Sequence, residues 1–158
     1  MPYLSQAAHI SSCGRYRYML ERAWGRGNAR LLIVGLNPST ADALLDDPTI
    51  RRCVGFAKGL GYDGLLMGNL FAARSTSPSA LASFEDPVGP ENDEWLLKLQ
   101  NRARGTVAAW GNGGRLNGRS QQVLKEMKNV SCFGVTNLGE PRHPLYLPAT
   151  TPLQRFQN

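Results

Sequence analysis

Short apolar runs alternate with helical hydrophobic spacing along this chain. Residues 31–36 and 65–70 are almost entirely apolar, which is typical of strands buried on both faces of a parallel sheet. Two shorter runs, 106–110 and 130–135, predict two more strands of the same kind. We therefore expect a central, mostly parallel sheet of four strands.

Helices are predicted between these strands. After the first strand, apolar side chains recur at intervals of three or four residues, at Ile50, Cys53, Val54, Ala57 and Leu60. Asp47 followed by Pro48 is a typical helix start, because the carboxylate caps free N–H groups and proline fits the first turn. Similar spacing near residues 95–99 and 123–127 predicts two further helices. The alternation indicates an α/β three-layer sandwich, a single domain spanning residues 1–158.

The N-terminal segment shows a different period. Large apolar and polar side chains alternate there, with Tyr16, Tyr18 and Leu20 between Arg15, Arg17 and Met19. This period of two, with a turn at Cys13-Gly14, predicts a β-hairpin between about residues 9 and 24. Residues 71–90 are rich in Ser, Pro and Ala and predict a long loop, a kind of segment that is usually functional or mobile.

Composition restricts the function classes. The chain has 158 residues, of which 42% are hydrophobic, and no stretch approaches the roughly 20 apolar residues of a membrane span. The first ten residues lack the pattern of a signal peptide, so we expect a cytoplasmic protein. The three cysteines lie far apart without CxxC spacing, which predicts no metal or iron–sulfur site. A net charge of +6 favours an anionic partner.

The residues that follow the predicted strands are unusually polar. They are Asn37, Ser39 and Thr40 after the first, Asn69 and Arg74 at the second, Gly111–Arg115 after the third, and Asn137, Arg142 and His143 after the fourth. Ligands of open parallel sheets bind beyond the carboxyl ends of the strands, so these residues are candidates for a site. Turns also select Asn and Gly for backbone reasons alone. Asn69 differs, since an amide in an apolar strand needs partners when it is buried.

Three segments together resemble the motifs of the uracil-DNA glycosylase superfamily. They are Gly35-Leu36-Asn37-Pro38, Asn69, and His143-Pro144, in that order. A nearer resemblance joins residues 37–42 and 47–52 to an uncharacterised bacterial and phage family, the domain-of-unknown-function family 1643. That nearer family carries no established activity.

The superfamily resemblance implies a role for each motif residue. Asn37 would hold the water that attacks the sugar carbon, Asn69 would bind the edge of an extruded base, and His143 would donate a hydrogen bond to the departing base. Pro38 and Phe71 would contact the base, with Phe71 in place of the usual stacking aromatic.

The resemblance also assigns contacts to DNA. The residues expected at phosphates are Ser39, Thr40, Arg51, Arg52, Arg74, Arg115 and Arg142. Leu145 or Tyr146, beside the third motif, would be the wedge that fills the space left by the flipped base.

The sequence therefore predicts a DNA glycosylase-like protein that flips a pyrimidine or modified base and hydrolyses its N-glycosidic bond without metal or other cofactor. The main alternative is a non-catalytic module of the same fold that binds nucleic acid, a nucleotide or a modified base. A third interpretation is an enzyme acting on free nucleosides or nucleotides, for which the arginines would matter little.

Overall fold

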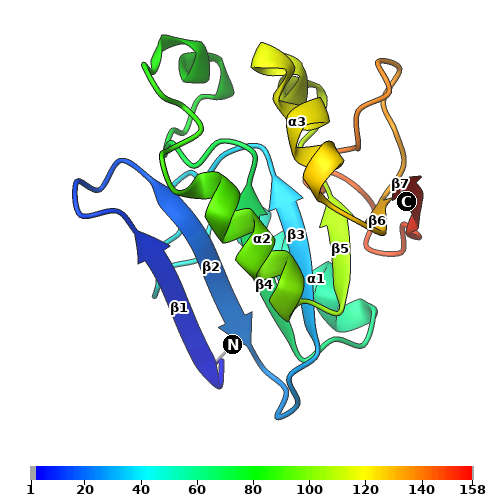
Figure 1. Ribbon diagram of the computed structural model, residues 1–158. Coiled ribbons are helices and arrows are strands. Elements are labelled where there is room, and N and C mark those ends of the chain that lie inside the picture. Colours follow the sequence, from blue (N-terminus) through cyan, green and yellow to red (C-terminus); the bar gives the residue numbers. More distant parts are fainter. Residues whose placement is uncertain (1–2, 158) are drawn as a thin grey trace.

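A seven-stranded mixed sheet organises the computed structural model, which describes residues 3–157 (Figure 1). Its strands are β1 (Ser5–Ile10), β2 (Arg17–Ala23), β3 (Arg30–Gly35), β4 (Gly64–Asn69), β5 (Gly105–Ala108), β6 (Val130–Cys132) and β7 (Gln154–Gln157). Their order is β1-β2-β4-β3-β5-β6-β7. The pairs β4–β3, β3–β5 and β5–β6 are parallel, whereas β1–β2, β2–β4 and β6–β7 are antiparallel.

The α/β class is confirmed, but the expected four-stranded, mostly parallel sheet is wrong in its number of strands. An N-terminal hairpin forms from β1 and β2, but its first strand begins at Ser5, before the predicted start near residue 9, and the hairpin does not stand apart. β2 pairs with β4 and so extends the sheet, and β7 adds a strand at the other edge. Local hydrophobic period identifies a strand without identifying its neighbour, which is why the hairpin's place was not predicted.

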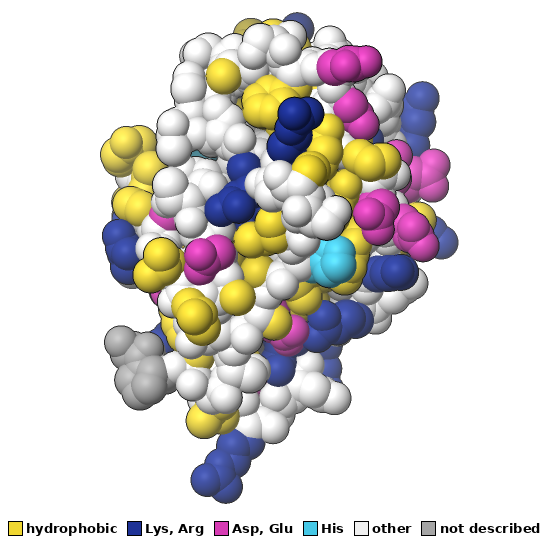
Figure 2. All heavy atoms as spheres, turned by 90° about the vertical axis from the view of Figure 1, so that its left-hand side faces the viewer, with side chains coloured by type: hydrophobic (Ala, Val, Ile, Leu, Met, Phe, Trp, Pro, Cys, Tyr) yellow, Lys and Arg dark blue, Asp and Glu magenta, His cyan; other side chains and the backbone are white. Residues whose placement is uncertain are grey.

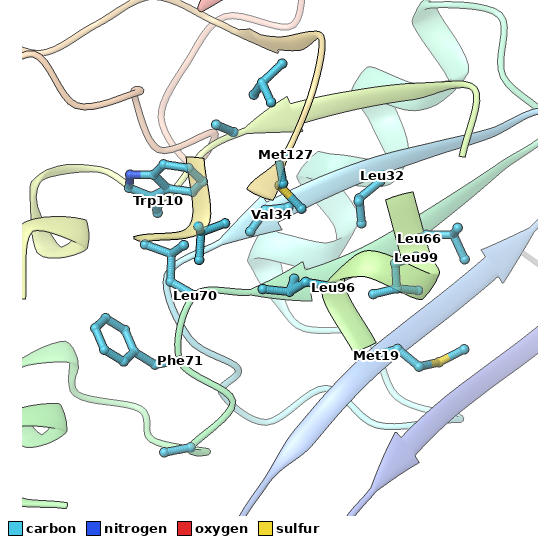
Figure 3. Close-up of a cluster of buried hydrophobic side chains, with 14 of the residues drawn as sticks. Met19, Leu32, Val34, Leu66, Leu70, Phe71, Leu96, Leu99, Trp110 and Met127 are labelled. Carbon is cyan, nitrogen blue, oxygen red and sulfur yellow. The ribbon is translucent and has the colours of Figure 1, made fainter. Parts of the chain in front are cut away.

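Helices cover both faces of the sheet. α1 (Pro48–Gly59) packs on one face, while α2 (Asn92–Arg102) and α3 (Arg119–Glu126) pack on the other. Because successive strand residues point to opposite faces, Leu31 and Ile33 join the α1 core and Leu32 and Val34 join the α2 core. Figure 3 shows the second core, where Leu32 and Val34 lie with side chains from α2. Short 3₁₀ segments, η1 (Pro78–Ser83) and η2 (Asn112–Gly118), interrupt the loops.

The predicted helix start at Asp47 is present. Its Oδ1 accepts a hydrogen bond from Ile50 N at 2.9 Å, and its Oδ2 accepts one from Ala41 N at 3.4 Å. The carboxylate thus caps α1 and ties the loop before it to the helix. This loop forms part of the pocket described below.

The positive charge of the chain is not gathered on the face along β1. Seen from that side, Lys and Arg side chains alternate with acidic and apolar ones (Figure 2). None of the helices formed by the described residues is long and apolar enough to cross a membrane.

Candidate functional site

A small pocket lies at the carboxyl ends of β3 and β4. Its volume is about 40 Å³, and its lining includes Asn37, Asn69 and His143. A water molecule occupies about 30 Å³ of the liquid, whereas pockets for small ligands span about 300–1,000 Å³. In this conformation the pocket therefore has room for water but not for a ligand of the size of a base, which must displace part of its wall.

The sheet brings the two asparagines together. Gly35 and Asn69 are direct partners in the parallel pairing of β3 and β4, so Asn37 emerges at the same edge as Asn69. His143 arrives from the loop after β6. A hydrogen bond from Gly111 N to Pro141 O at 2.8 Å joins that loop to the segment after β5, and one from Arg142 N to Gly134 O at 2.9 Å closes the loop on itself.

Asn69 is buried, with 3% of its surface exposed. Its Oδ1 accepts a hydrogen bond from Arg17 Nη2 at 3.3 Å, and an arginine can only donate. The amide nitrogen must therefore point away from Arg17. It lies along Gly35, where an added Cβ would stand 3.0 Å from Asn69 Nδ2. No acceptor among the described residues bonds this Nδ2, so it is a donor open to a ligand.

His143 is held as a neutral donor. Its Nδ1 accepts a hydrogen bond from Leu145 N at 3.2 Å, which places the ring proton on Nε2. Burial also lowers the pKa of His143 below its ordinary value of 6.5, because the imidazolium would lose hydration. At neutral pH the ring can donate from Nε2 without carrying charge.

Asn37 faces the pocket with the opposite polarity. Its Nδ2 donates to three backbone carbonyls, those of Pro38 at 3.1 Å, Ser75 at 3.0 Å and Ala73 at 3.4 Å. The described residues provide no donor to its Oδ1. The side chain therefore offers an acceptor, of the kind that orients a water molecule.

Arg17 is a pocket residue that sequence reasoning missed. It is 2% exposed, and its Nη1 donates to Ala41 O at 3.1 Å in addition to the bond to Asn69. Its Nε is buried without a partner among the described residues. Burial lowers the pKa of Arg17 to about 10, so the guanidinium stays charged at neutral pH.

The alternation in the hairpin gave no signal for this position. It would put Arg17 on the outer face with Arg15 and Met19. In the structure the run 17–20 is wholly buried, because β2 lies between β1 and β4 and is covered on both faces.

Two of the residues expected at the base, Pro38 and Phe71, differ in position, and Pro38 lines the pocket. Of two residues expected at phosphates, Ser39 lines the pocket as well, whereas Thr40 is exposed and does not. Phe71 is fully buried in the core on the α2 side and is absent from the pocket wall. Figure 3 shows it beside Leu70 in that core. The structure therefore corrects the assignment of Phe71 as the stacking aromatic.

The five arginines expected at phosphates fall into two groups. Arg51, Arg115 and Arg142 are exposed, while Arg52 and Arg74 are half-buried. Arg52 Nη2 donates to Leu147 O, and Arg74 Nη1 donates to Gly14 O at 3.4 Å, so both hold loops. None of the five lines the pocket, but Arg51 and Arg142 directly adjoin the lining residues Ile50 and His143.

The two wedge candidates also separate. Leu145 is half-buried and its N–H is bonded to His143, whereas Tyr146 is 91% exposed. Tyr146 has a φ of 76°, a left-handed backbone conformation that costs a non-glycine residue about 1 kcal/mol or more. An exposed aromatic held in a strained turn beside the pocket suits contact with a partner better than packing.

Comparison with protein families assigns the chain to one family. A model of a protein family of unknown function, DUF1643, matches residues 17–145. The chain belongs to the DUF1643 family. The match begins at Arg17 and ends at Leu145, so it contains every pocket residue discussed above. For this DUF1643 protein, no match was found among curated proteins or solved structures. The resemblance to uracil-DNA glycosylases gains no support from these comparisons and stays a prediction.

The pocket side chains leave a defined set of hydrogen-bonding groups free for a ligand. It combines one acceptor, Asn37 Oδ1, with two neutral donors, Asn69 Nδ2 and His143 Nε2, over a buried cation, Arg17. Within residues 3–157 no cluster of three or more His, Cys, Asp or Glu side chains is arranged to hold a metal ion. What the pocket residues can do is bind an acceptor-rich group and orient a water beside it.

Proposed function

We propose that this DUF1643 protein binds DNA, takes one extruded base into the pocket, and hydrolyses the N-glycosidic bond of that nucleotide. The observation that carries the proposal is the convergence of Asn37, Asn69 and His143 on one pocket with complementary hydrogen-bonding roles. One acceptor can orient the attacking water, and two donors can stabilise the departing base.

The reaction makes charge at two places. As the bond between the sugar C1′ and the base nitrogen breaks, its electron pair goes to the base and the sugar becomes cation-like. Donors aimed at the base stabilise that developing anion, typically by about 3–4 kcal/mol for each donor. Asn69 Nδ2 and His143 Nε2 supply such donors.

Asn37 serves the other half of the reaction. Its free Oδ1 accepts a hydrogen bond from water and directs the water oxygen toward C1′. The water forms the new C–O bond and gives up a proton, which the base anion or solvent takes. The fixed amide nitrogen of Asn37, bonded to three carbonyls, keeps the acceptor oriented.

A neutral histidine suits this role. An imidazolium would leave Nδ1 unable to accept the Leu145 N–H and would break the contact that orients the ring. Since burial already lowers the pKa of His143, the donor stays neutral and in place over the physiological pH range.

Binding of a base requires the pocket to widen from its volume of about 40 Å³. In this proposal the loop with His143 is the wall that moves. Its bond from Arg52 Nη2 to Leu147 O lies outside the pocket and must shift when the loop opens. Tyr146, exposed on the same loop, fills the space in the base stack. Arg51, Arg115 and Arg142 contact phosphates with exposed guanidinium groups.

A second candidate is a non-catalytic module that binds nucleic acid or a modified base. It is favoured by the Asp47 carboxylate in the pocket lining, because both of its oxygens accept backbone N–H groups and it is not free to take the proton of an attacking water. Such a module would use Asn69 and the arginines but would have no need of Asn37 Oδ1 beside the sugar. The two candidates share the binding surface and differ only in base release.

The test is an activity screen on labelled oligonucleotides that contain uracil, hypoxanthine or hypermodified pyrimidines, in single- and double-stranded form. Alkali cleaves the abasic sites and reports base release, and the His143→Ala variant is the control. We expect cleavage of at least one substrate by the wild type alone. Binding with no release by any substrate would replace the hydrolase with the non-catalytic module. Hydrolysis confined to free nucleosides would replace DNA as the substrate.

A further inference from the structure

We infer that Arg17 is a specificity-determining positioning residue, which fixes the Asn69 amide so that the pocket accepts a base with an oxo group at that edge and rejects the amino counterpart. The inference rests on the proposed base pocket. It does not require base release, so the two can fail separately.

The orientation of Asn69 follows from Arg17. An amide can usually be turned by 180°, which exchanges its donor and its acceptor. Here the turned amide would point Nδ2 at the guanidinium, donor against donor, at the place where Oδ1 now accepts at 3.3 Å. Both side chains are almost fully buried, so neither could satisfy its donor with bulk water instead.

Arg17 is not explained as a tether alone. Arg22, on the same strand and also buried, has Asp46 as an ion-pair partner at 2.8 Å and donates to the carbonyls of Asp42 and Leu45. Arg17 has no ion-pair partner among the described residues, and its Nε is unpaired. A buried charge with incomplete partners is destabilising, which suits a residue kept for a site.

The consequence is a pocket whose base-reading groups are donors. Asn69 Nδ2 is one, and His143 Nε2 is the other because Leu145 N occupies Nδ1. An oxo group opposite Asn69 accepts from Nδ2, whereas an amino group meets a donor that cannot turn away. The Asp47 carboxylate also lines the pocket and offsets part of the charge of Arg17, so the discrimination depends on the two hydrogen-bond donors.

Equilibrium binding tests this without chemistry. The probes are single-stranded oligonucleotides in which one 2′-fluorinated nucleotide carries uracil or cytosine, or hypoxanthine or adenine, each pair differing by oxo against amino. The N-glycosidic bond of such a nucleotide resists hydrolysis because the fluorine destabilises the cation-like sugar. For the wild type we expect the oxo member of at least one pair to bind about 10- to 100-fold more tightly.

Substitutions then assign that preference to Arg17. Arg17→Met should bring the oxo-to-amino ratio close to one, because the Asn69 amide can then turn to suit either base. Arg17→Lys, which keeps a donor and a charge, should restore part of the ratio. Arg22→Met is the matched control, since it removes a buried arginine of the same strand that does not touch Asn69, and it should keep the wild-type ratio.

Several outcomes overturn the inference. Equal binding of the oxo and amino members by the wild type overturns it. This outcome needs no variant, so it holds even if Arg17→Met fails to fold. Equal loss of both members in Arg17→Met, with the ratio kept, would make Arg17 a structural tether only. In either case base release in the oligonucleotide screen could still stand. Failure of all four probes to bind above an undamaged oligonucleotide would remove the base pocket and the inference together.

Discussion

Two hollows, the groove between α2 and α3 and the pocket at the carboxyl ends of β3 and β4, differ in volume and in the polar groups that they leave unpaired. The groove between α2 and α3 has a volume of about 460 Å³, against about 40 Å³ for the pocket with Asn37. In the groove, Arg119 already has partners, Asp93 Oδ1 at 2.7 Å and Leu70 O at 2.8 Å. In the pocket, side chains from three segments leave donors and an acceptor unpaired. On the groove side, the buried Asn92 Oδ1 also lacks a partner among the described residues, but it is a single atom and does not line the groove. The gathering of several unpaired polar groups around one hollow, rather than volume, marks the site.

Residues on two sides of β4 hold different parts of Asn69. From the groove side, Asn92 Nδ2 donates to the backbone carbonyls of Asn69 and Leu70, at 2.9 and 3.0 Å. From the pocket side, Arg17 holds the Asn69 side chain. Asn92, in the first turn of α2, therefore supports the end of β4, and Arg17 positions the Asn69 side chain that lines the pocket.

The largest expected effect is on catalysis in the pocket. His143→Ala and Asn37→Ala should each lower the single-turnover rate of base release by about 10²–10³, or about 2.7–4 kcal/mol, because both act on the transition state. Binding of the same oligonucleotide, measured separately, should change little. Wild-type rates in both variants would show that the pocket does not carry the reaction.

Adding a methyl group at Gly35, in the pocket lining, should lower the stability of the protein. In Gly35→Ala the new Cβ would stand 3.0 Å from both Asn69 Nδ2 and Met67 Cε, so we expect a loss of about 1–3 kcal/mol in the free energy of unfolding. Gly55→Ala is the control, since nothing lies within 4 Å of its Cβ and it is helical, and it should stabilise by about 0.5–1 kcal/mol. Denaturant unfolding measures both. An unchanged Gly35→Ala protein would contradict the close packing of Gly35 on Asn69.

The pH dependence should report the neutral state of His143. Its folded pKa lies below 6.5, so the rate of base release should stay constant as pH falls through 6.5 and decline only below the folded pKa, by about tenfold per unit. The unfolded chain binds this proton more readily, so the His143 contribution to stability falls as pH drops below about 6.5 and is complete above it. A rate that rises as pH falls would point to an imidazolium instead.

The salt dependence of DNA binding should identify the arginines that contact phosphates. The expected effect on affinity is smaller than the effects above. Replacing Arg51 and Arg142 by alanine should reduce the slope of log K against log salt by about one to two units. Arg52 is left out because its guanidinium bonds Leu147 O. Lys128→Ala, an exposed site before β6 at the amino ends of the strands, should keep the slope. Equal slopes in the wild type and all variants would show that DNA binds to another surface of the protein.

The smallest effect is expected in the groove. Gln122 is exposed and lines it, so Gln122→Ala should change stability by no more than about 0.5 kcal/mol and leave base release unaltered. A large loss of activity in this variant would reverse the comparison between the two hollows.

Much of this molecule is determined by local sequence. The apolar runs of β3 and β4 and the periodic spacing of α1 are read directly from the chain, and Asp47 with Pro48 fixes where α1 begins. The polar residues at the strand ends are equally visible, since the carboxyl ends of parallel strands share an edge. These features depend on neighbours within a few residues, which is why a pattern predicts them.

The tertiary structure decided the rest. Pairing of β2 with β4 buries Arg17 against Asn69, which the alternation of the hairpin would have placed outside. Tertiary contacts also set the face on which Phe71 packs, the added strand β7 and the small volume of the pocket. Each depends on which distant segment covers a given face. Burial of a charge is a property of that covering, because the same arginine is solvated on an edge strand and becomes part of a site between two strands.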